Sequence, residues 1–150
     1  MELLLAIALS SIIAILAAKI FGKIIDSYIY SRQLLEMGSQ TQLAMERIIY
    51  EIGESKTNEV IISPSHDEVT FIAHEDSVNK HIHYYVSGNN LYRDDLTDGI
   101  SPEILIDNVV KFSINKGKDI NGVKRFFYPI ILECKNGKLE WKIKSAAKCQ

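Results

Sequence analysis

At 150 residues the chain is long enough for one compact domain and too short for two. The formal net charge is −2, but residues 1–115 carry 8 Lys or Arg against 16 Asp or Glu, whereas residues 116–150 carry 9 against 3. The basic residues are scattered over predicted strands and turns, which argues against nucleic-acid binding. The split is also compatible with complementary faces on neighbouring copies of one protein, or with simple solvation.

The N-terminal segment is apolar from Leu3 to Phe21, apart from Ser10, Ser11 and Lys19. As a helix it would be roughly 28 Å long, close to the ~30 Å hydrocarbon core of a bilayer. A cleaved signal peptide has a basic start and a shorter apolar core, and a buried core helix is seldom apolar on all sides for five turns. We therefore expect residues 1–21 to be a transmembrane segment.

The helical pattern continues beyond this segment. Apolar residues recur at three- and four-residue spacing from Ile24 to Leu35 and again from Met45 to Ile52, and Gly53 is a plausible stop. Gly22 and Gly38 are weak points, each costing about 1 kcal/mol relative to alanine. We expect residues 22–53 to form an amphipathic half of the same helix, packed on the rest of the chain.

Residues 54–150 have a period of two, which predicts a β-rich head. An Asn-Gly pair at Asn136 predicts a hairpin turn, and Pro129 argues for an edge position or a bulge in its strand. The expected fold is α+β, a long N-terminal helix packed on an antiparallel sheet. The predicted strands are Asn58–Ser63, Glu68–His74, Lys80–Ser87, Asn90–Arg93, one alternating at Val110, Phe112 and Ile114, Arg125–Cys134, and one alternating at Leu139, Trp141 and Ile143.

The start of the chain, Glu2 to Leu9 and on through Ala18, resembles the start of mature type IV pilins and type II secretion pseudopilins. Ser31 to Ile48 is similar to the packing helix of minor members. The head resembles J-type minor pseudopilins and W-type minor pilins in the order of five short segments, Glu68–Phe71, His83–Val86, Asn90–Arg93, Ile106–Val109 and Lys111–Ile114.

The resemblance implies a function in assembly. Glu2 matches the family's near-N-terminal glutamate, which pairs with the N-terminal amine of an adjacent subunit; an alternative is that Glu2 lies at the headgroup boundary because it starts the chain. The implied partners are other pilins or pseudopilins, the inner-membrane assembly platform and, for the precursor, a prepilin peptidase. The implied location is the bacterial inner membrane with the head in the periplasm, and a position at or near the filament tip.

The family's leader peptide and cleavage glycine have no counterpart before Glu2, so we expect that upstream sequence is missing. Lys19 and Lys23 follow the apolar segment and nothing basic precedes it. The positive-inside tendency would by itself place the head in the cytoplasm. A basic leader would reverse that orientation and export the head.

The two cysteines, Cys134 and Cys149, lack the spacing of a zinc site or a redox pair. If the head is exported, we expect a disulfide between them that ties down the C-terminus. The alternative is two free cysteines in a reducing compartment.

Metal-binding candidates are weak. His81 and His83 project from the same face of a predicted strand, a spacing that can chelate, and Asp94, Asp95 and Asp98 lie in a turn that misses the EF-hand spacing. We expect a solvated sheet face and a polar turn at these positions, with calcium as the alternative because some pseudopilins bind it.

No nucleophile motif, phosphate loop or cofactor fingerprint occurs, so we expect no enzyme and no cofactor. The main expectation is a minor pilin or pseudopilin. The alternative is a single-pass protein whose helix tethers a periplasmic binding or sensor module.

Overall fold

The computed structural model describes residues 2–75, 78–117 and 127–149. Within these residues the chain forms one long helix, α1 (Glu2–Gly53), followed by strands, which confirms the α+β class. The chain divides into two compact units, Met1–Glu36 and Met37–Gln150, and α1 contributes to both.

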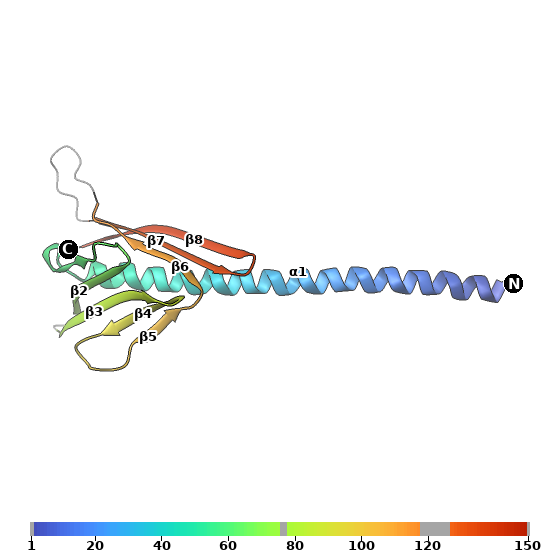
Figure 1. Ribbon diagram of the computed structural model, residues 1–150, viewed down its shortest axis with the longest axis horizontal. Coiled ribbons are helices and arrows are strands. Elements are labelled where there is room, and N and C mark those ends of the chain that lie inside the picture. Colours follow the sequence, from blue (N-terminus) through green and yellow to red (C-terminus); the bar gives the residue numbers. More distant parts are fainter. Residues whose placement is uncertain (1, 76–77, 118–126, 150) are drawn as a thin grey trace. The chain divides into compact units, whose positions relative to one another are not determined.

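The second unit holds all the strands, and they form two antiparallel sheets instead of one. Five strands in sequential order make the first sheet, and three make the second (Figure 1). A 3-10 turn, Thr57–Glu59, precedes them. The five-stranded sheet contains β1 (Ile61–Ile62), β2 (Glu68–Glu75), β3 (Val78–Ser87), β4 (Asn90–Asp95) and β5 (Glu103–Ile106), and the three-stranded sheet contains β6 (Val109–Ile114), β7 (Phe127–Asn136) and β8 (Leu139–Lys148).

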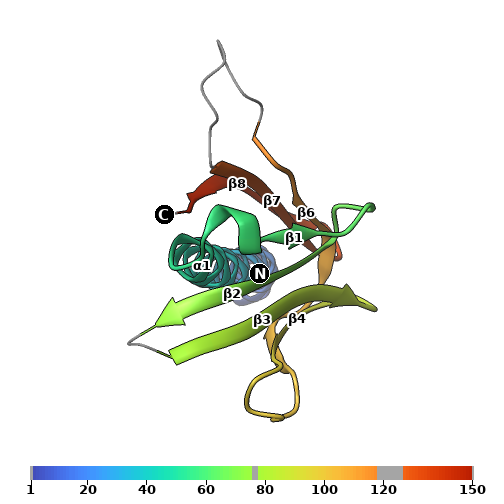
Figure 2. The same cartoon turned by 90° about the vertical axis from the view of Figure 1, so that its left-hand side faces the viewer.

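The part of α1 in the second unit lies between the two sheets, as the view along the helix shows (Figure 2). Its buried apolar residues, Ala44, Met45, Ile48 and Ile52, follow the three- and four-residue spacing of a single helical stripe. The inward-facing residues of both sheets complete one core around this stripe. Among the largest fully buried side chains are Phe71, Ile82, Tyr84, Leu91, Ile114, Tyr128, Ile130 and Leu132.

Helix α1 ends at Gly53, as predicted. The Ser55 amide and hydroxyl both donate to the Ile52 carbonyl, at 3.1 and 2.6 Å, so the freed carbonyl of the last turn is satisfied. The next strand starts later than expected, because Thr57–Glu59 is a 3-10 turn and β1 covers only Ile61–Ile62.

One predicted strand detail was wrong, and one strand was not predicted. Val110 is 64% exposed instead of facing the core, because a bulge shifts the register between Val109 and Lys111 and buries Val109 in its place. Strand β5 had no predicted counterpart. The predicted strand Arg125–Cys134 is described from Phe127 onward, and its first two residues lie outside the described residues.

Pro129 lies in β7, the middle strand of its sheet, and not at an edge. Its carbonyl accepts a hydrogen bond from the Asn115 amide at 3.0 Å, but proline has no N–H to return. Strand β6 accordingly ends at Ile114, one residue before the position opposite Pro129. The proline is tolerated because it lies where the β6–β7 ladder stops.

The chain passes from one sheet to the other at Asn108, which has a left-handed backbone with φ of 57°. Asparagine tolerates this conformation better than most residues do. The Asn108 carbonyl accepts from the Lys135 amide at 2.8 Å, and the Val109 amide donates to the Asn89 carbonyl at 2.7 Å. Hydrogen bonds on both sides thus hold the crossover.

A partly buried ion-pair network joins α1 to the five-stranded sheet through Glu51, whose side chain is 13% exposed. The Arg93 Nε group donates to both Glu51 oxygens, at 2.9 and 3.1 Å, and the Tyr84 hydroxyl donates to Oε2 at 2.6 Å. Arg47 Nε donates to Oε1 at 3.2 Å, and its Nη1 reaches Glu103 of β5 at 3.0 Å. Burial beside the Glu51 charge raises the pKa of Tyr84.

Replacing Glu51 with alanine leaves the Arg93 charge and the Tyr84 hydroxyl without their main partner. We expect Glu51→Ala to lower the free energy of unfolding by about 3 kcal/mol, measured by urea unfolding of the full chain in detergent. The matched control is Glu46→Ala, because Glu46 is exposed and bonds only to Gln42. Equal losses in the two variants would contradict the assigned role.

Gly38 is buried against the indole of Trp141 in β8. A methyl group added at Gly38 would lie 3.1 to 3.3 Å from three ring carbons. This glycine inside the helix is therefore a point of close approach between the three-stranded sheet and α1.

We expect Gly38→Val to displace the indole and to destabilise the head by about 1–3 kcal/mol. Trp141 is the one tryptophan of the chain, so its fluorescence reports directly on this contact. The emission should shift to longer wavelength in Gly38→Val and stay unchanged in Ser39→Val, which places the same side chain at a neighbouring exposed position.

Candidate membrane-spanning and assembly segment

Among the described residues, α1 is the one helix long and apolar enough to cross a membrane. Between Leu3 and Phe21, the large apolar side chains whose exposure is described are each more than half exposed and lie on every side of the helix. Surface of this kind requires an apolar cover, either lipid or other helices. These side chains include Leu3, Leu4, Ile7, Leu9, Ile12, Ile13, Ile15, Leu16, Ile20 and Phe21.

The two serines between Leu3 and Phe21 form hydrogen bonds within the helix itself. The Ser10 hydroxyl donates to the Ile7 carbonyl at 3.0 Å, and the Ser11 hydroxyl donates to the Ala8 carbonyl at 2.8 Å. Neither serine therefore opposes burial in an apolar medium.

Apolar exposure on α1 does not end at Phe21. Ile24, Ile25, Tyr28 and Ile29 are 47–67% exposed, and Leu35 is 74% exposed. From Leu3 to Leu35 the helix rises about 48 Å, roughly 18 Å more than a bilayer core. Among the described residues of α1, the first buried one is Gly38.

Glu2 lies in the first turn of α1, where a negative charge interacts favourably with the helix dipole. Its side chain is exposed in this structure. A carboxylate next to an apolar segment is costly in a membrane unless another group pairs with it.

The structure brings two of the metal-ligand candidates, His83 and Asp94, together and separates the others. His81 and His83 are on β3, and Asp94 is opposite His83 on β4, on the outer face of the sheet. Asp95 lies on the inner side, 4.0 Å from Arg93, and Asp98 follows in the next turn. Within the described part of the chain, no group of three His, Cys, Asp or Glu side chains is arranged to hold a metal ion.

The predicted disulfide is wrong, because both cysteines are free thiols. Cys134 lies opposite Trp141 in the β7–β8 hairpin. Cys149 follows Trp141 by eight residues, which in an extended strand is a distance of roughly 26 Å. A disulfide requires Cα atoms within about 7 Å. Closeness in sequence did not translate into contact because an antiparallel hairpin brings together only residues directly opposite one another.

Each thiol instead packs against one end of the buried part of α1. Cys134 Sγ is 3.5 Å from the Thr41 hydroxyl, and Cys149 Sγ is 3.5 Å from the Ser55 hydroxyl and 3.4 Å from the Ile52 carbonyl. Burial raises the pKa of both thiols, and burial with the nearby Cys149 raises the pKa of Tyr128 to about 12.

Sequence reasoning missed the Glu51 network and the contact of Gly38 with Trp141. A single carboxylate on the apolar side of a helix was a usable signal for the first, since such a charge is rarely left unpaired. Glycine inside a helical pattern was the signal for the second.

Comparison with known proteins found no matching family model, no match among curated proteins and no matching solved structure.

The burial of both thiols predicts their reactivity. A thiol reagent at neutral pH should modify neither cysteine in the native chain and both cysteines in denaturant, because burial excludes the reagent and disfavours the thiolate. Mass spectrometry without reductant should find the chain two hydrogens heavier than a disulfide-linked form. Rapid native labelling of either cysteine would contradict the packing described above.

Proposed function

We propose that the chain is a minor pilin or pseudopilin, a structural subunit that assembles through α1 into a type IV pilus or a type II secretion pseudopilus. The observation that carries the proposal is the length of the exposed apolar surface of α1. A simple tether requires apolar surface only across the bilayer, but here it continues to Leu35. Packing against the helices of neighbouring subunits would cover the part that lipid does not reach.

The remaining support is the resemblance of the N-terminal sequence and the order of the head. On this proposal the head is periplasmic, the chain lies at or near the filament tip, and its partners are other pilin-like subunits and the inner-membrane platform. The Glu2 carboxylate pairs with the N-terminal amine of a neighbouring subunit, which compensates its charge and sets the register of the helices.

Cysteine cross-linking tests the assembly of the helices. Single cysteines at Ile12 and Ile29 report on the bilayer segment and on the stretch beyond it, and the buried native thiols do not interfere. In cells that carry the assembly system, both positions should give adducts with pilin-like subunits, whereas Lys138→Cys in the β7–β8 turn serves as a control for random collision. Monomers at both helix positions would favour a tether.

The role of Glu2 is tested separately. Glu2→Ala should block incorporation into filaments, because the neighbouring amine loses its partner, while unfolding of the head should be unchanged. Incorporation is measured as the fraction of the subunit recovered with sheared filaments. Glu36→Ala, an exposed carboxylate on the same helix, is the control. Normal incorporation of Glu2→Ala would exclude the role assigned to it.

A further inference from the structure

The outer face of the three-stranded sheet gathers lysines that are scattered in the sequence. Lys111 and Lys142 flank Glu133 across the strands, Ile131 is opposite Lys144, and Lys135 is opposite Glu140. We call this surface the lysine face; it consists of Lys111, Glu133, Lys135, Glu140, Lys142, Lys144 and Lys148.

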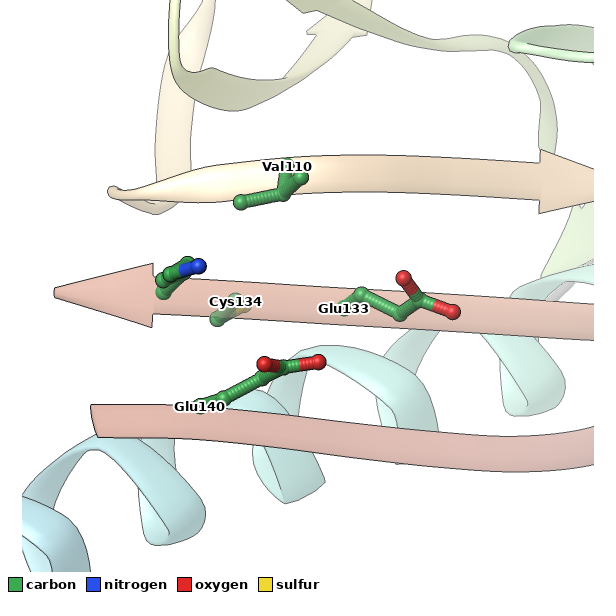
Figure 3. A pocket seen from close by; sticks show the side chains of 5 residues that line it. Val110, Glu133, Cys134 and Glu140 are labelled. Atoms are coloured by element: carbon green, nitrogen blue, oxygen red, sulfur yellow. The ribbon is translucent and has the colours of Figure 1, made fainter. Parts of the chain in front are cut away.

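Two carboxylates divide the lysine face. Glu133 is bonded to Lys142, which lowers the pKa of the Glu133 carboxyl and keeps it ionised. Figure 3 shows Glu133 and Glu140 around a cavity of about 90 Å³ between β6, β7 and β8. Five ammonium groups and two carboxylates give this face a net positive charge, with negative groups set among the positive ones. A patterned face fits a protein surface better than the uniform charge of a phosphate backbone.

The outer face of the five-stranded sheet is complementary to it. Glu68, Tyr85 and Tyr92 are opposite one another in one row, and His83 and Asp94 are paired in the next. The Tyr85 and Tyr92 rings stack at 5.3 Å between centroids, and the His83 and Tyr85 rings at 4.8 Å. We call this surface, with Thr70 included, the aromatic face.

The aromatic face suits ammonium groups in two ways. Lysine is attracted to the faces of tyrosine rings and to the carboxylates of Glu68 and Asp94. Among the described residues, no lysine or arginine lies on the outward-facing positions of β2, β3 and β4, because Lys80 and Arg93 are on the inner side of their strands.

We propose that the lysine face of one copy docks on the aromatic face of a second copy of this chain, an inference that rests on the assembly function proposed above. The two sheets lie on opposite sides of α1, so their outer faces point away from each other (Figure 2). One copy can thus use both faces at once. The contact is head-to-tail, so a few copies could dock one after another in a short run at or near the filament tip.

The size of the contact makes it dependent on the helices. Strands β7 and β8 have ten residues each and β6 has six, so at a spacing of about 4.8 Å the three give a face on the order of 400 Å². A stable interface buries about 800 Å² on each partner. Head docking alone is therefore weak, and it operates where assembly through α1 already holds two copies at a high local concentration.

Reporter cysteines test the pairing of the faces in cells that carry the assembly system. One tagged copy carries Ser113→Cys on the lysine-face side, and a differently tagged copy carries Thr70→Cys on the aromatic-face side. Mild oxidation should link position 113 of one copy to position 70 of the other. Adducts of 70 with 70 and of 113 with 113 in equal amount would overturn the proposal.

Charge reversal makes the test specific. Lys142→Glu with Lys144→Glu in the first copy should reduce the 70–113 adduct about tenfold, because like charges then oppose each other. Glu68→Lys with Asp94→Lys in the second copy should restore it. Lys56→Glu with Lys116→Glu, two exposed lysines outside the face, should have no effect. Loss without restoration would overturn the pairing of these two faces and indicate another anionic partner.

The Ile12 adduct separates this inference from the proposed function. Helix adducts without a 70–113 adduct would overturn the docking of the heads and leave assembly through α1 intact. A 70–113 adduct without helix adducts would support the docking and count against assembly through α1.

Discussion

The Glu51 carboxylate is the constraint on which the head depends, because it is a charge on a helix enclosed between two sheets. Arg93 and Tyr84 of the five-stranded sheet both donate hydrogen bonds to it. These bonds allow the five-stranded sheet only one angular position around α1. Gly38 is thirteen residues earlier, about 140° around the helix, and it receives the three-stranded sheet. The hydrogen bonds of Glu51 on one side and the contact of Gly38 with Trp141 on the other therefore determine how the helix is rotated within the head.

Much of the fold could be predicted from the sequence because it depends on local pattern. The change of period from 3.6 to 2 at Gly53 and the alternation from Leu139 to Ile143 were both sufficient to locate elements. The division into two sheets was not visible, since it depends on one left-handed residue, Asn108, between two strands. The bulge that exposes Val110 could not be predicted either. A single extra residue exchanges the inward-facing and outward-facing side chains of a strand without changing its composition.

The candidate site shows the same division between local and long-range information. The apolar N-terminal segment could be recognised as a continuous run of residues, and α1 contains a candidate membrane span there. The disulfide prediction failed because spacing along the chain says nothing of register, and register places Cys134 opposite Trp141. The lysine face was missed for a related reason: alternate residues of three strands form one surface only after the strands are aligned.

Cys149 gives the order in which the head can form during synthesis. It is buried against Ser55, 94 residues earlier, and Cys134 is buried against Thr41, 93 residues earlier. Such distant contacts make folding slow, and the Cys149 contact cannot form before the last strand has been made. The hydrophobic helix emerges before the strands, and Cys149, which packs against its end, emerges after them. Until the strands have been made, the apolar surface of the helix is exposed. Early insertion of the helix into a lipid bilayer would keep it from aggregating.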